Sequence, residues 1–117
     1  MQIQVHTDNH TSGSAGLTKK VDAIVADAME RFGDRITRVE VHLTDENGRQ
    51  KSGDGDKRCV MEARLAGLQP ITVSAQGSDL MQAVHGAVDK LEKTIKRTLG
   101  RLDDTRGRTS FTGNDIE

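Results

Sequence analysis

The sequence predicts an α+β domain with the element order β-α-β-β-β-α, in which a four-stranded sheet carries both helices on one face. Three observations lead to this prediction. Four short segments alternate apolar and polar residues with a period of two, two longer segments repeat apolar residues with the helical period, and every segment has a single apolar face. Burying all these faces in one core requires both helices on the same side of the sheet, an arrangement like that of a double-stranded-RNA-binding domain.

The first half of the chain contains a strand, a helix and a second strand. Residues 2–6 alternate and predict a short strand. A polar segment rich in Gly and Ser follows, and residues 15–32 then place apolar side chains on one helical stripe, which Gly33 ends. Alternation returns at residues 35–44, which predicts the second strand.

The second half contains a hairpin and a long helix. A polar loop at residues 45–56 precedes two further alternating segments, 59–66 and 71–76, whose short connection indicates a β-hairpin. Residues 80–102 carry an apolar stripe with helical period, preceded by a Ser-Asp pair suited to an N-terminal cap. We expect this helix to end at Gly100 or shortly after it.

Composition limits the chain to one domain with an aliphatic core. The 117 residues include only two aromatic side chains, Phe32 and Phe111. We expect the domain to span residues 1–102, and residues 103–117, which lack periodicity, to form a disordered C-terminal tail. Cys59 is the single cysteine, and no apolar signal segment or membrane-spanning run is present, so we expect a cytoplasmic protein without a membrane partner.

The charge of the chain is nearly balanced but unevenly distributed. The formal net charge of −1 argues against a uniformly basic nucleic-acid binder. Residues 1–46 carry a net charge of −3 and residues 103–117 carry −2, whereas residues 47–78 and 79–102 carry +2 each. The positive charge therefore gathers in the second half of the expected domain.

The final helix carries a candidate RNA-binding surface. At 100° per residue, four of its cations fall within about 80° of arc, opposite the apolar stripe, and span about 16 Å along the helix. That length suits about two or three backbone phosphates. These cations are Lys90, Lys93, Arg97 and Arg101. A merely solvated helix face is the alternative interpretation, and periodicity alone leaves both open.

The polar loop contains Arg49 and Lys51, and two further candidate RNA-binding residues, Lys57 and Arg58, follow it directly. They would extend the cationic surface if the loop lies beside the final helix, and a flexible hairpin connection is the alternative interpretation. The exposed sheet face has no aromatic side chains on which bases stack. Binding is therefore expected through phosphates and shape, to folded or double-helical RNA, with strong salt dependence.

Signals for catalysis and metal binding are weak. The four histidines, His6, His10, His42 and His85, lie in four separate segments and form no HExxH motif, and paired CxxC motifs are absent. The sequence contains no P-loop or dinucleotide fingerprint, and Cys59 begins a strand on its core face, where a packing role is expected. We expect no enzyme activity, no metal, no cofactor and no small-molecule substrate.

Two blocks of the sequence have a characteristic order and spacing. One is Phe-Gly-Asp-Arg-Ile-Thr-Arg-Val-Glu-Val at 32–41; the other is Ser-Ala-Gln-Gly-Ser-Asp-Leu at 74–80, followed by Ala-Val at 83–84 and Asp-Lys-Leu-Glu-Lys at 89–93. Together they resemble the ribosome hibernation-promoting factor and ribosome-associated inhibitor family, the sigma-54 modulation protein family, in its short form. The resemblance covers about residues 1–102.

The resemblance implies the same β-α-β-β-β-α fold and a binding site in the small-subunit channel where messenger and transfer RNAs meet the decoding region. The basic helix edges of the family face ribosomal RNA there. Lys90 and Lys93 match the family's Asp-Lys-Leu-x-Arg/Lys pattern, and Arg97 fits the basic region that follows. The family's first helix usually carries basic residues in its second half, whereas in this chain its cations, Lys19 and Lys20, lie near the start.

The leading hypothesis is a protein that binds the small ribosomal subunit and its rRNA and inhibits translation by occupancy. It is expected to be monomeric when free. Long members of the family add a C-terminal dimerising domain, for which the 15 residues after Leu102 are too few, so ribosome pairing through such a domain is not expected. A double-stranded-RNA-binding module and a protein-interaction module that does not act on the ribosome are the alternatives.

Overall fold

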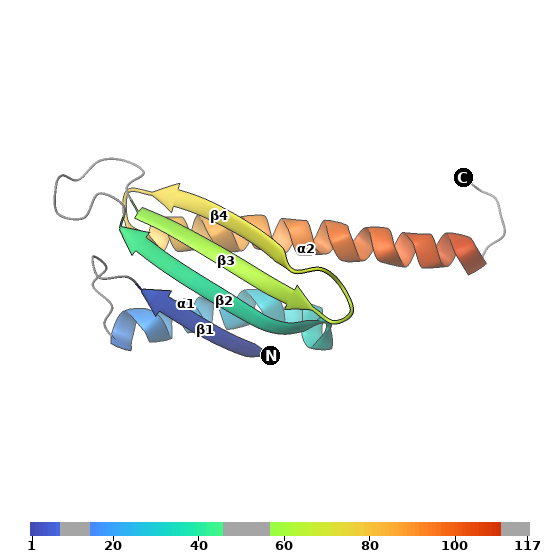
Figure 1. The fold of residues 1–117 in the computed structure, drawn as a ribbon, viewed down its shortest axis with the longest axis horizontal. Helices are drawn as coiled ribbons and strands as arrows, with labels where there is room; N and C mark the ends of the chain where they lie inside the picture. The colour runs from blue at the N-terminus through green and yellow to red at the C-terminus, as the bar shows by residue number, and fades with distance from the viewer. Residues whose placement is uncertain (8–14, 46–56, 111–117) are drawn as a thin grey trace.

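The computed structural model describes residues 1–7, 15–45 and 57–110 and has the predicted order of strands and helices (Figure 1). A short 3-10 segment, η1, follows the first helix. The elements are β1 Gln2–Thr7, α1 Ala15–Met29, η1 Glu30–Arg35, β2 Ile36–Asp45, β3 Lys57–Leu65, β4 Ile71–Gly77 and α2 Leu80–Ser110. The α+β fold predicted from the sequence is confirmed.

The four strands form one mixed sheet in the order β1-β2-β3-β4, so β1 and β4 are its edges. β1 pairs with β2 in parallel, which requires a crossover, and α1 supplies it. The β2–β3 and β3–β4 pairs are antiparallel. The register keeps apolar residues in phase across the strands: Val41 lies opposite Val5 on one side and Met61 on the other. One face of the sheet is therefore apolar.

Both helices pack on that apolar face, and Figure 1 shows them together behind the sheet. α1 lies against β1, and α2 lies against β3 and β4, so each helix covers half of the sheet. Alternate residues of β2 and β3 meet the helix stripes in a core of aliphatic side chains. Its largest fully buried members are Met29, Ile36, Leu43, Met61, Leu91 and Ile95. The predicted single-sided packing is confirmed.

Local signals fix the ends of the helices. Gly33 has a φ of 57°, a left-handed conformation that glycine adopts without a Cβ penalty, and the chain turns there from η1 into β2. At the start of α2, Asp79 Oδ1 accepts a hydrogen bond of 2.8 Å from the Gln82 backbone N–H, and Gln82 Oε1 accepts one of 2.7 Å from the Ser78 backbone N–H. This reciprocal capping starts α2 where the sequence predicted it.

The prediction that the last helix ends near Gly100 is wrong, because α2 continues to Ser110. The helix thus includes residues 103–110 of the expected C-terminal tail, while residues 111–117 lie outside the described part of the chain. Extending an existing helix adds one backbone hydrogen bond for each residue fixed, so a helix can continue past the end of its apolar stripe. Among the described residues, no helix is both long and apolar enough to cross a membrane.

Candidate nucleic-acid interface

The packing of α2 decides where its charged residues lie. Leu91 and Ile95 are fully buried against the sheet. On one flank of the helix, Glu92 faces η1, where its carboxylate lies 3.9 Å from the Arg31 guanidinium. On the other flank, Lys90 Nζ donates a hydrogen bond of 2.8 Å to the backbone carbonyl of Ser74 in the edge strand β4. The cationic side of α2 therefore lies along the β4 edge of the sheet.

An open groove of about 410 Å³ runs between α2 and β4. Its lining comes from two residues of the strand and four of the helix, including three of the predicted RNA-binding cations. The lining residues are Val73, Ser74, Lys90, Lys93, Thr94 and Arg97. The structure thus brings Lys90, Lys93 and Arg97 together in a concave, cationic surface, which we call the α2–β4 groove. Arg101 is exposed one turn further along the helix and does not line the groove.

The contacts within the groove leave its cations accessible to a ligand. Lys93 forms an ion pair of 3.1 Å with Asp89, but both side chains are largely exposed, at 73% and 61%. Exposed pairs at this helical spacing contribute only about 0.3–0.5 kcal/mol. The ion pair with Asp89 therefore costs little to break. The Thr94 hydroxyl donates to the Lys90 carbonyl at 2.8 Å, so it is already satisfied inside the helix.

The structure does not place Lys57 and Arg58 in the α2–β4 groove. Lys57 pairs with Gly77 at the end of the sheet where α2 begins. The groove cations begin ten residues into α2, about 15 Å along its axis. Arg58 alternates with the buried Cys59, so it belongs to the opposite, open face of the sheet. Arg49 and Lys51, the two cations within the loop, lie outside the described residues.

Lys19 and Lys20 also lie apart from the groove. Both are exposed on α1, which covers the β1 half of the sheet, whereas the groove follows the β4 edge. Of the eight predicted RNA-binding residues, three therefore lie together in the α2–β4 groove, and the other five lie elsewhere on the surface.

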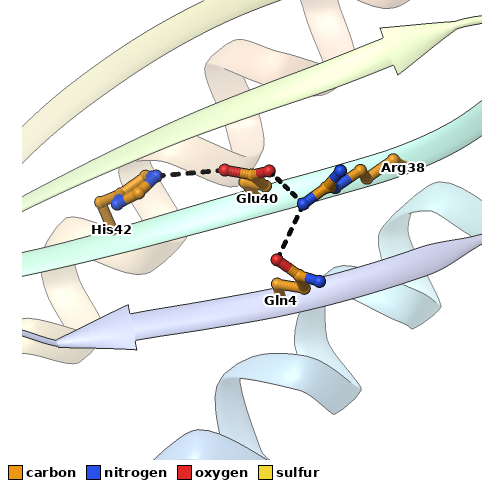
Figure 2. A network of polar contacts seen from close by, with 4 residues as sticks. All are labelled: Gln4, Arg38, Glu40 and His42. Atoms are coloured by element: carbon orange, nitrogen blue, oxygen red, sulfur yellow. Dashed lines mark hydrogen bonds and ion pairs between the residues drawn. The ribbon is translucent and has the colours of Figure 1, made fainter.

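The open face of the sheet is polar, as the sequence predicted, and carries a connected network (Figure 2). Arg38 Nη2 donates to Gln4 Oε1 at 2.9 Å and lies 2.5 Å from Glu40 Oε2. The other oxygen of the same carboxylate, Oε1, lies 3.5 Å from His42 Nε2. The His6 ring stacks on the His42 ring with centroids 4.7 Å apart.

Sequence reasoning missed this cluster because it treated the histidines as unrelated. Among the described residues, His6, Glu40 and His42 offer ligand atoms that all lie within 4.8 Å of one another. The available signal was the alternation in both strands, which puts all three on the polar face, but their pairing depends on the β1–β2 register. His85 is exposed on α2, and His10 lies outside the described residues.

Cys59 is fully buried on the core face of β3. Its burial raises the pKa of the thiol from 9.0 to about 12, because the surrounding apolar groups disfavour the charged thiolate. The thiolate is the form that attacks electrophiles and binds metals, so Cys59 is suited to packing and not to nucleophilic chemistry.

Known proteins share this fold. The model of the family described as Sigma 54 modulation protein / S30EA ribosomal protein matches residues 3–103. The N-terminal domain of Protein Y from Thermus thermophilus is similar in structure, with a TM-score of 0.66 and 23% identity over 84% of this chain and 99% of that one. A ribosomal subunit interface protein from Coxiella burnetii gives a TM-score of 0.65 and 17% identity over 86% of this chain and 99% of that one. No curated protein sequence matches the chain.

Proposed function

The chain belongs to the Sigma 54 modulation protein / S30EA ribosomal protein family, and we propose that it binds the small ribosomal subunit and inhibits translation. The match over residues 3–103 confirms the resemblance that the two sequence blocks indicated. Family membership supports a role related to the ribosome. The name of the Coxiella burnetii neighbour, a ribosomal subunit interface protein, supports the same direction.

The observation that carries the proposal is the α2–β4 groove. Three cations from two successive turns of one helix line a concave surface beside an edge strand. Lysine and arginine side chains at this spacing bind the phosphates of an RNA backbone, and the groove gives the backbone a shape to follow. The exposed ion pair between Lys93 and Asp89 is the main local competitor for a phosphate, and it is weak.

The mechanism is occupancy, without a chemical step. Phosphate contacts from Lys90, Lys93 and Arg97 hold the domain on ribosomal RNA, and Arg101 extends them by one helical turn. The bound domain fills space that messenger and transfer RNAs need in the channel of the small subunit. Because the affinity comes from phosphate contacts, it falls steeply as the salt concentration rises.

Co-sedimentation with purified small subunits tests the site. We expect the double change Lys93→Glu and Arg97→Glu to weaken binding at least about tenfold, because each reversal replaces a phosphate contact with repulsion. Lys96→Glu is the matched control. It reverses one charge on the same helix, but its four-residue spacing from Glu92 puts it on the flank that faces η1, away from the groove. Equal loss in the control, or full binding by the double variant, would contradict the assigned site.

Competition with free duplex RNA separates this proposal from general RNA binding. A ribosome-directed protein stays on the small subunit in the presence of excess duplex, whereas a double-stranded-RNA-binding module transfers to the duplex. The inhibitory part is tested by adding the protein to a translation reaction. Wild type is expected to reduce the yield in proportion to the small subunits occupied, and the double variant to leave it unchanged.

A further inference from the structure

We propose that His6, Glu40 and His42 form a binding site for Zn²⁺ on the open face of the sheet. The site lies on β1 and β2, at the other side of the molecule from the α2–β4 groove. It is independent of the proposed RNA contacts, because no groove cation belongs to it.

The register of the parallel strands creates the site. His6 and His42 are direct partners across β1 and β2, and Gln4 and Glu40 are partners one step earlier. Side chains two residues apart on a strand share a face, so Glu40 and His42 project from the same side of β2. Three side chains with metal-ligating atoms thus meet on an exposed surface, from segments that are far apart in the sequence.

The distances between the ligand atoms fit a zinc ion once the two imidazole rings rotate. Tetrahedral Zn²⁺ holds nitrogen and oxygen ligands at about 2.0–2.2 Å, so its ligand atoms lie about 3.4 Å apart. His42 Nε2 and Glu40 Oε1 are already 3.5 Å apart, and all three ligand atoms lie within 4.8 Å of one another. The stacked rings, inclined by 14°, must turn so that their nitrogen lone pairs converge on the ion. His6 is exposed and the His42 side chain is 50% exposed, so both rings have room to turn.

Arg38 holds the carboxylate in a suitable orientation. Its guanidinium pairs with Glu40 Oε2 and is itself held by Gln4, while Glu40 Oε1 faces the imidazole of His42 (Figure 2). A partner on the second oxygen is the usual way in which a protein orients a ligating carboxylate. The positive charge of Arg38 beside the site lowers its affinity for a cation, so we expect binding weaker than that of closed four-ligand zinc sites.

The ligand set favours zinc over the hard divalent cations. Two imidazoles and one carboxylate provide three protein ligands and leave a fourth position for water, which suits Zn²⁺. Mg²⁺ and Ca²⁺ require more oxygen ligands than the cluster offers. Cys59 does not compete for the ion, because its thiol is buried on the other face of the sheet. A bound ion would join the edge strand β1 to β2.

Zinc titration of the full chain without an affinity tag tests the site by calorimetry. We expect one Zn²⁺ per chain, no binding of Mg²⁺, and at least about tenfold weaker binding of Zn²⁺ by His6→Ala and by His42→Ala. His85→Ala is the matched control, since it removes an exposed imidazole from α2, and it should bind like wild type. Unchanged binding in both cluster variants, or equal loss in the control, overturns the proposal.

A second measurement does not depend on the folding of any variant. In the NMR spectrum of the wild-type protein, zinc is expected to shift the ring signals of His6 and His42 together, and EDTA to restore them. The His85 ring signals should stay unchanged. Absence of a joint, reversible shift of His6 and His42 at saturating zinc rules the site out.

Discussion

The β4 edge of the sheet and its β1–β2 side offer different chemistry. Along β4, α2 contributes ammonium and guanidinium groups, and Lys90 binds a carbonyl of the edge strand directly. On β1 and β2, the open face carries imidazoles, a carboxylate and an amide joined by one arginine. The first surface suits a polyanion and the second a metal cation. A chain with a net charge of −1 can present both surfaces because their charges are separated by the core.

The two surfaces also differ in how they are built. The α2–β4 groove depends on the spacing of residues along one helix, with the strand edge as a wall. The histidine cluster depends on the register of two strands that α1 separates in the sequence. A change in the packing of α2 should therefore move the groove cations, whereas a change in β1–β2 pairing should separate the histidines.

The largest expected effect comes from Leu91→Ala, which removes a fully buried side chain where α2 meets the sheet. The free energy of unfolding should fall by about 3 kcal/mol, from lost burial and from the cavity left behind. Urea denaturation measures it, with Lys96→Ala as a surface control whose change stays within about 0.5 kcal/mol. The two surfaces share one core, so histidine NMR signals and helix circular dichroism should report the same midpoint. Separate midpoints would show that the α2–β4 groove and the histidine cluster belong to parts of the protein that unfold independently.

The next effect in size concerns the salt dependence of small-subunit binding. Lys93→Gln and Arg97→Gln each remove one expected phosphate contact. Each should therefore make the negative slope of log affinity against log salt shallower by about 0.7–0.9. His6→Ala should leave both the affinity and the slope unchanged, because that side chain lies outside the α2–β4 groove. Binding measured at four salt concentrations decides this. A shallower slope in the His6→Ala variant would mean that the open face of the sheet also contacts RNA.

Asp79→Ala tests the start of α2. Its carboxylate accepts a hydrogen bond from the Gln82 backbone N–H, so the variant should lose about 1 kcal/mol of stability. Asp79→Asn is the control, because an asparagine cap retains the accepting oxygen and should lose less. Thermal unfolding measures both variants. An equal loss in both would indicate that the charge of Asp79, acting on the helix dipole, matters more than the hydrogen bond.

The sequence predicted the fold because each element carries its own apolar period. The stripe of α2 also located Lys90, Lys93 and Arg97 on one side, since helical spacing is a local property. The helical spacing did not show that β4 would lie beside these cations and form a groove with them, because that arrangement depends on the packing of segments distant in the sequence. Strand register is likewise non-local, so the pairing of His6 with His42 was missed.

The smallest expected effect concerns Asp89. Replacing it distinguishes the contribution of the Lys93–Asp89 ion pair to stability from the role of Lys93 in binding. Asp89→Asn removes the partner of Lys93, and stability should fall by only about 0.3–0.5 kcal/mol because the pair is exposed. Affinity for the small subunit should rise instead, since Lys93 no longer has to leave a carboxylate to reach a phosphate. The rise should be largest at low salt, where the competing carboxylate is least screened. A decrease in affinity would mean that Asp89 positions Lys93 for binding, and the groove would then be an ordered site in which the ion pair belongs to the bound state.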